Sequence, residues 1–512
     1  MRRSVRILLI LSLTVSASAQ AVDWKKPLKK VDWKKPIDKV RELQEKRRKR
    51  STTLPITTSS MKARKLFEAG RADFENLKTD KALENWRKAT KLDPKFALAH
   101  IEIALVSKDP AEQNRELKQA KALTRQVTAG ERLFIRWVAG VRENNYVAGI
   151  QAMNDVVAKY PRDKHLIYIV GNWLILQESY DQCRKMMERA LAVDPGFPPA
   201  LNNLGYAYAS TREYKKAFDV METYVAVLPH EPNPNDSYGE ILRMSGDFAG
   251  ALQHYNAALK IDPLFAQLGV ADTYALMGDG ERARAEYAKG IDQATSASDR
   301  VELGMQSAMT WVREKKYGKA DSAFLAVAAE AHGAQLGLHE AQIHRMMAIY
   351  QPDDAVALNH LKTAEEILVS NPNLLKSDLD EERARVLRWR AIRASRAGDN
   401  ETANKALEEL QALESSSGSR QISHAYHAAV GAVLMMQESY FAAIPHLEED
   451  HENAFSMKLL AEAYARTGAM AEANEQYKKL TTMNLPTIDQ AVVVPAARER
   501  LAANPPAAAD SH

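Results

Sequence analysis

The residues best suited to chemistry are few in this chain, and they are scattered. The densest group of metal-ligand types is the run from His446 to His451, which crosses from the end of an expected helix into a turn. Four ligands converging tetrahedrally, as zinc requires, do not follow from this spacing, so we interpret the run as a solvated turn. Cys183 is the single cysteine, which excludes an intrachain disulfide and a cysteine-based zinc site.

Motifs for nucleotide, metal and nucleophile chemistry are missing from the sequence. There is no phosphate-binding P-loop, no dinucleotide-binding glycine pattern, no HExxH and no nucleophile elbow. Cys183 and the neighbouring methionines Met186 and Met187 have the spacing of helix packing. We therefore predict no catalytic residue, no metal and no cofactor, and a hydrolase or metal enzyme is the least supported function.

The first 21 residues have the pattern of a cleavable signal peptide. Three arginines precede a short apolar run over residues 7–15, and small residues fit cleavage between Ala19 and Ala21. The run is far shorter than the roughly 20 residues that span a bilayer; an uncleaved anchor or a buried helix is the alternative. We expect an exported chain with no transmembrane helix in its mature form. It would be periplasmic if the cell has an outer membrane, and otherwise secreted or envelope-associated.

Residues 22–50 form a segment that we call the basic arm. It holds nine lysines and four arginines against five carboxylates, although the whole chain has a formal net charge of only +4. Within it a tryptophan followed by two lysines and a proline occurs twice, nine residues apart. The first copy contains Trp24, Lys25 and Lys26, and the second contains Trp33, Lys34 and Lys35. Such an arm could dock on an anionic membrane surface or envelope polymer, and a solvated linker is the alternative reading.

Nucleic acid would also match the charge of the basic arm, but export makes it a poor partner. Residues 51–60 are rich in serine and threonine and are expected to complete the arm as a linker up to residue 60.

A 34-residue period dominates the middle of the chain. Four kinds of residue recur at this spacing and in one register. They are prolines at 161, 195, 229 and 263, aromatic residues at 146, 180, 214 and 248, small residues at 149, 183, 217 and 251, and glycines at 171, 205 and 239. Trp137 breaks the glycine series. A period of 34 predicts a helix–turn–helix unit that must stack on its neighbours to bury its apolar face.

These columns resemble the tetratricopeptide repeat family over residues 63–487, most clearly over 130–265. The resemblance implies an all-α, right-handed superhelix, a solenoid of about twelve antiparallel helix pairs. We expect an N-terminal array over residues 61–300 and a degenerate C-terminal array over 301–487. A closing helix and a disordered tail are expected over 488–512.

In this family the first helix of each unit lines the concave face. The resemblance therefore places a partner groove at Phe134, Tyr168, Asn172, Asn202, Asn203, Tyr206, Asp236 and Glu240. Tyrosine and asparagine suit peptide binding, since both combine contact area with hydrogen-bonding groups. Ordinary solenoid surface is the alternative. A clamp for a C-terminal carboxylate is not expected, because Tyr168, Asn233 and Ser237 stand where lysine or arginine would be needed.

Two functions fit these observations. The first is an exported scaffold or adaptor that binds a protein or peptide along its concave face. The second is a structural spacer of the cell envelope, held to an anionic surface by the basic arm.

Overall fold

The computed structural model describes residues 52–263 and 265–503. Within these ranges every regular element is a helix, so the expected all-α solenoid is confirmed. The predictions made for the signal peptide, the tail from residue 504 and the basic arm lie outside the described residues. The arm residues concerned are Trp24, Lys25, Lys26, Trp33, Lys34 and Lys35.

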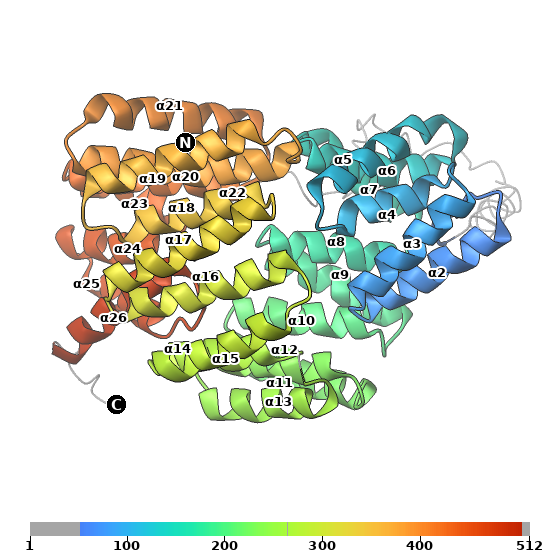
Figure 1. The fold of residues 1–512 in the computed structure, drawn as a ribbon, viewed down its shortest axis with the longest axis horizontal. Helices are drawn as coiled ribbons and strands as arrows, with labels where there is room; N and C mark the ends of the chain where they lie inside the picture. The colour runs from blue at the N-terminus through green and yellow to red at the C-terminus, as the bar shows by residue number, and fades with distance from the viewer. Residues whose placement is uncertain (1–51, 264, 504–512) are drawn as a thin grey trace, which may run out of the picture. The chain divides into compact units, whose positions relative to one another are not determined.

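The described helices form twelve antiparallel pairs, which we call units 1 to 12 in chain order (Figure 1). Units 1 to 6 are α2 Met61–Glu75 with α3 Thr79–Leu92, α4 Ala97–Val106 with α5 Pro110–Ala122, α6 Ala129–Arg142 with α7 Tyr146–Lys159, α8 Lys164–Leu176 with α9 Tyr180–Val193, α10 Pro198–Ser210 with α11 Tyr214–Val227, and α12 Pro232–Ser245 with α13 Phe248–Ile261. A short 3-10 helix, η1 Thr124–Gln126, joins units 2 and 3.

Units 7 to 12 are α14 Gln267–Met277 with α15 Gly280–Gln293, α16 Ala297–Arg313 with α17 Tyr317–Gly333, α18 Gly337–Tyr350 with α19 Asp354–Ser370, α20 Lys376–Arg396 with α21 Asn400–Ser416, α22 Arg420–Met436 with α23 Tyr440–Glu449, and α24 Ala454–Arg466 with α25 Met470–Thr481. The expected closing helix is α26, Ile488–Ala503, and it packs on both helices of unit 12 and on α16 and α18. No helix in the described ranges is both long and apolar enough to cross a membrane.

The repeating columns are the packing positions of each pair. Cys183 and Met187 are fully buried on α9, and a methyl group added at Gly171 of α8 would lie 2.0 Å from the Met187 methyl carbon. Glycine thus lets the two helices of unit 4 approach closely. Unit 3 reaches the same closeness differently, because a methyl group at Gly140 would lie 2.7 Å from the Cα of Gly149. Trp137 can therefore replace glycine in that unit.

The superhelix winds back on itself, so units 3 to 5 meet units 10 to 12. The contacts come from the turns inside units 3, 4 and 5, at three residues spaced by 34. Asn144 bonds Asp380 and Ser417, Glu178 bonds Gln421 and pairs with His424, and Arg212 bonds Thr482 and the carbonyl of Lys479. We call this line of contacts the interturn seam.

The three seam residues hold a left-handed backbone, with φ of 58° at Asn144, 54° at Glu178 and 61° at Arg212. The equivalent turn of unit 6 has Gly246, at φ 94°. Glycine adopts this conformation without strain, whereas other residues do so at a cost. Each of the three retains a side chain at this strained position, and each side chain bonds the next superhelical turn.

Residues 52–60, which belong to the linker expected over residues 51–60, are bonded to the helical array. The backbone N–H of Leu54 donates to the Asp163 carboxylate at 2.8 Å, that of Thr57 to Glu131 at 2.7 Å, and that of Ser59 to Asp93 at 2.9 Å. These carboxylates stand near the starts of α8, α6 and α4. The serine and threonine content therefore serves docking across units 2 to 4, through side chains such as Thr57, whose hydroxyl also donates to Glu131.

Candidate functional site

The inner face of the array carries the groove residues expected from the sequence, but much of that face is filled. Phe134 is 1% exposed and Tyr168 is 3% exposed. The Phe134 ring packs edge-on against Trp137, and the Tyr168 ring packs against Phe74 of unit 1 and Phe197. Their expected exposure in a groove is thus corrected, because units 1 to 4 curve tightly enough for inner side chains to meet one another.

The three groove asparagines lie on α8 and α10. Asn203 donates its side-chain amide to the Asn172 side-chain oxygen at 3.3 Å, and Asn202 and Asn203 are both buried. The Asn202 side-chain oxygen is buried without a hydrogen-bond partner in the described chain. Asn172 is half-buried and lines a cavity. Their role in binding a peptide stays a prediction.

Two further groove residues, Tyr206 and Glu240, belong to a polar network that joins the first helices of units 5 and 6 to both helices of unit 7. The Tyr206 hydroxyl donates to Glu240 at 2.7 Å. Arg243, only 2% exposed, bonds Glu240 and Asp272, and the Tyr287 hydroxyl donates to Asp272 at 2.5 Å. These bonds link units 5 to 7, and the Nε atom of Arg243 is buried without a hydrogen-bond partner in the described chain.

Asp236 lies beside this network on α12. Burial, with a further contribution from the charge of Glu240, raises the pKa of Asp236 to about 7, against the opposing effect of Arg243. Burial likewise raises the pKa of Asp272 to about 6. The inner face of units 6 and 7 thus contains two carboxyl groups that titrate near neutrality.

A cavity of about 590 Å³ lies between the two superhelical turns. The first helices of units 2, 3 and 4 form one wall, and α20 with the start of α22 forms the other, near where α20 lies beside α6 (Figure 1). We call it the interturn cavity. Sequence reasoning placed only Asn172 of its lining in a site. Trp137, the exception in the glycine column, was the signal that could have pointed to it.

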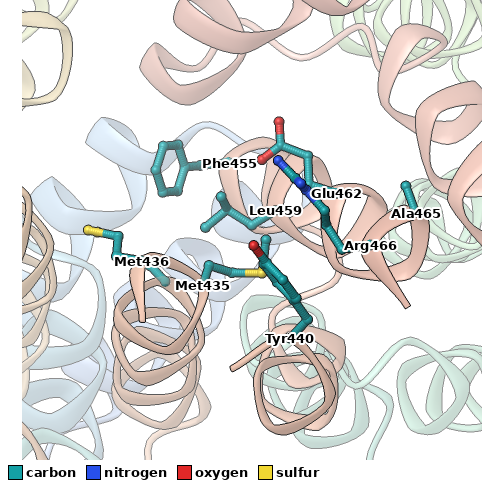
Figure 2. Close-up of a pocket in the computed structure, with 9 residues that line it drawn as sticks. Met435, Met436, Tyr440, Phe455, Leu459, Glu462, Ala465 and Arg466 are labelled. Carbon is teal, nitrogen blue, oxygen red and sulfur yellow. The ribbon is translucent and has the colours of Figure 1, made fainter. Parts of the chain in front are cut away.

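A second hollow, of about 490 Å³, lies on the inner face of units 11 and 12. We call it the C-terminal hollow, and its lining is Ala432, Met435, Met436, Tyr440, Phe455, Leu459, Glu462, Ala465 and Arg466. Figure 2 shows Glu462 and Arg466 close together, with Leu459 and Phe455 extending the apolar part of the lining away from them. Met436 is 39% exposed, so apolar surface is open to solvent here.

None of these residues was singled out from the sequence, although the register contains them. In unit 5 the glycine of the first helix, Gly205, lies twelve residues before the small residue of the second helix, Ala217. In unit 12 the small residue of the second helix is Ala473, so the position equivalent to Gly205 is Ala461. Glu462 then takes the place of Tyr206, one of the expected groove residues. The signal is the repeat register itself, continued into the degenerate C-terminal units.

Arg466 is the charged group of the C-terminal hollow with the least local compensation. Its guanidinium lies 5.8 Å from the centre of the Tyr440 ring, and no described carboxylate forms an ion pair with it. Glu462, in contrast, pairs with Lys458 at 2.9 Å. The hollow therefore combines an apolar floor with a guanidinium that forms no ion pair with any described carboxylate.

The candidate metal ligands of the sequence do not gather into a site. His446 faces His427 with 2.9 Å between their Nδ1 atoms, while His451 contacts the carbonyl of Glu448. In the ranges that the structure covers, no group of three or more such side chains could hold a metal ion. Cys183 is fully buried, and burial raises the pKa of its thiol to about 12.

Comparisons with known proteins match parts of the chain. A family model described as "Tetratricopeptide repeat" matches residues 177–235. Protein bimA of Emericella nidulans is 31% identical over 99 residues, which make up 19% of this chain and 12% of that protein. The chain thus matches far less than two thirds of the length of this relative.

Two solved structures align with most of this chain at low sequence identity. The APC/C hetero-tetramer Cut9–Hcn1 aligns over 87% of this chain and 81% of that chain, at 15% identity and a TM-score of 0.40. The human IFIT1 dimer with PPP-AAAA aligns over 75% of this chain and 90% of that chain, at 16% identity and a TM-score of 0.38. Residues 177–235 thus match the tetratricopeptide repeat, and the twelve stacked helix pairs have the fold of a solenoid built from such helix–turn–helix units.

Proposed function

We propose that the chain is a scaffold that binds a segment of another protein on its inner face, and that the C-terminal hollow recognises this segment. Concave faces are the usual binding surfaces of solenoids. Inner positions of units 3 to 7 are occupied by contacts within the chain, whereas the C-terminal hollow presents open apolar surface. The proposed role is binding and requires no bond-making step.

The chemistry of the hollow indicates what the segment contains. Met435, Leu459 and Phe455 form apolar surface that fits one large aliphatic or aromatic side chain. Arg466 stands at the edge of this surface without a described carboxylate partner, so a carboxylate of the bound segment would complete it. The unpaired guanidinium beside apolar floor is the observation that carries the proposal, and the occupant is an acidic segment with a bulky apolar residue.

The test is selection of peptides from a random display library on the full chain, followed by fluorescence anisotropy with the recovered peptides. We expect recovered sequences to combine aspartate or glutamate with leucine, phenylalanine or tryptophan. The variant Arg466→Ala should weaken their binding about tenfold, because a charge-assisted hydrogen bond is lost.

Arg282→Ala is the matched control. Arg282 also lies over a tyrosine ring, that of Tyr274 at 5.6 Å, but it is on the second helix of its unit, so binding should be unchanged. Basic peptides whose affinity falls in Glu462→Gln would overturn the proposed chemistry. So would acidic peptides that bind the Arg466→Ala variant as tightly as the original chain.

We further propose that the chain is exported and that the basic arm holds it at an anionic surface, as the alternative function requires. The sequence pattern of residues 1–50 supports this. Vesicles containing phosphatidylglycerol should retain the chain that starts at Val22, and retention should fall as salt rises. A chain that starts at Ser51 should not be retained. Equal retention of both chains would exclude the arm as the anchor.

A further inference from the structure

Each unit has two edges, and the interturn seam joins an edge of one kind to an edge of the other kind. At the turn edge the first helix of a unit ends and the second begins, whereas at the entry edge the first helix begins. The hydroxyl of Tyr146, at the turn edge of unit 3, donates to Glu381 at the entry edge of unit 10 at 3.2 Å. Tyr180, one unit later, donates to Glu452 at the entry edge of unit 12 at 3.0 Å. Hydroxyl groups of turn edges thus bond carboxylates of entry edges.

Residues 52–60 cover the entry edge of units 2 to 4, and we call them the strap. Their backbone N–H groups bond the carboxylates of that edge, which are Asp93, Glu131 and Asp163. Leu54 of the strap is only 5% exposed and packs with the core of these units. These units stand at the start of the described array, so no earlier superhelical turn covers them. The strap therefore takes the place that a turn edge holds in the interturn seam.

The turn edge at the other end of the array, in units 11 and 12, is open. Tyr440 has the position of Tyr146 and Tyr180, but no later unit of the described array follows to present a carboxylate to it. Phe441 beside it is 79% exposed, and Met470, which has the position of Tyr440 in unit 12, is 55% exposed. This edge thus presents a tyrosine and apolar side chains that the fold leaves without a covering segment.

The two edges at the ends of the array have matching chemistry. The entry edge of units 2 to 4 offers three carboxylates and the place of one apolar side chain, that of Leu54. The turn edge of units 11 and 12 offers Tyr440 and Phe441, and turn edges already bond entry edges in the interturn seam.

We propose that a second copy of this chain docks the turn edge of its units 11 and 12 on the entry edge of units 2 to 4 when the strap is released. Such a contact joins two different surfaces, so it continues the superhelix from copy to copy into an open assembly. The tethered strap competes for the entry edge at a high effective concentration, which keeps the chain monomeric while the strap is bound. This self-association goes beyond the binding of a protein segment in the C-terminal hollow.

The first experiment releases the strap in the full chain without altering the helical array. Leu54→Asp combined with Thr57→Asp places new carboxylates beside Asp163 and Glu131, and like charges repel. Hydrogen exchange of residues 52–60 should then become fast, while the helices stay protected. Lys62→Asp is the control, because it changes the net charge by the same amount at an exposed position of α2, and it should leave the strap protected.

Sedimentation then measures the assembly of each chain. The unaltered chain should be monomeric, and the released variant should form assemblies that lengthen as its concentration rises. Phe441→Asp, added to the released variant, should abolish them, because it brings a carboxylate against the carboxylates of the entry edge. Phe441 does not line the C-terminal hollow, so this change leaves that site in place. Val369→Asp is the control, since Val369 is 76% exposed on the second helix of unit 9, and it should leave assembly unchanged.

Mixing of chains provides a second test. The unaltered chain has a covered entry edge and an open turn edge, so it can join only one end of an assembly and should shorten the assemblies of the released variant. The unaltered chain with Phe441→Asp should not shorten them.

The proposal is wrong if the released variant stays monomeric at every concentration, if its assembly survives Phe441→Asp, or if Val369→Asp disrupts assembly equally. A strap that stays protected in the chain with Leu54→Asp and Thr57→Asp would also contradict it, because the carboxylates of the entry edge would then not control what binds there.

Discussion

The inner faces of units 3 and 4 and of units 11 and 12 occupy equivalent positions of the repeat but have different surroundings. Across from Trp137 and Trp173 stand α20 and the start of α22, which line the same cavity from the other superhelical turn. Around Glu462 and Arg466 the lining comes from units 11 and 12 alone. Unit 3 meets unit 10 and unit 5 meets unit 12, whereas the helix that follows unit 12, α26, packs on α16, α18 and unit 12 itself.

This difference teaches that exposure in a solenoid is set by winding. A repeat position can be core-like where a later turn covers it and surface-like where the chain ends. An arginine illustrates the contrast. Arg388, 7% exposed, pairs with Asp450 at 3.2 Å, while Arg466 lies in the open C-terminal hollow with no described carboxylate partner.

The largest effect should come from removing the buried arginine. Arg388→Ala leaves the Asp450 carboxylate buried without its ion-pair partner, which should lower the free energy of unfolding by about 3–5 kcal/mol. Arg466→Ala should change it by less than about 0.5 kcal/mol, because no described ion pair is lost. Urea unfolding with hydrogen exchange of α20 and α24 measures both. Similar losses in the two variants would contradict the difference in environment.

An intermediate effect should come from the interturn seam. Asn144→Gly relieves a left-handed backbone but loses the bonds to Asp380 and Ser417, for a net loss of about 1–2 kcal/mol. Glu438→Gly is the matched change, since Glu438 has φ 59° and its exposed side chain bonds no other described residue. That variant should gain about 0.5–1 kcal/mol. Thermal unfolding measures the stability of both variants. A gain in stability in both would show that the hydrogen bonds of the interturn seam do not stabilise the fold.

A smaller effect on stability, and one that depends on pH, should come from Asp236 beside the polar network. The folded-state pKa of Asp236, about 7, lies above the value of about 3.9 for an unfolded chain. The native state therefore binds the proton more tightly, and stability falls as the pH rises from about 4 to 7. Asp236→Asn should remove that decline and be about 1 kcal/mol more stable than the original chain at pH 8.

The melting temperature measured between pH 4 and pH 8 tests this expectation. Glu240, Arg243 and Asp272 act on Asp236 and remain in place in the variant. Asp219→Asn, a change at an exposed aspartate of the same region, is the control and should leave the pH profile of the original chain. A decline that survives in Asp236→Asn would assign it to another carboxyl group, such as Asp272.

Much of the fold could be predicted, because the periodic residues act within one unit or between neighbours. Gly171, Cys183 and Met187 identified a helix pair whose packing the structure confirms. Site residues were harder to predict. Phe134 and Tyr168 have the register of a groove, but their burial depends on contacts with other units, such as that of Tyr168 with Phe74. Residues 51–60 were expected to form a linker, because serine and threonine are common both in linkers and in docked segments.

The amino-acid sequence alone was enough to establish the repeat, the pairing of helices and the register of the inner face. These properties follow from local spacing, since side chains three and four residues apart share a helix face and a 34-residue period repeats the same unit. Only the tertiary structure decided which inner residues are covered. That depends on the small rotation from each unit to the next, added over about seven units before Asn144 meets Asp380, and no local pattern records such a sum.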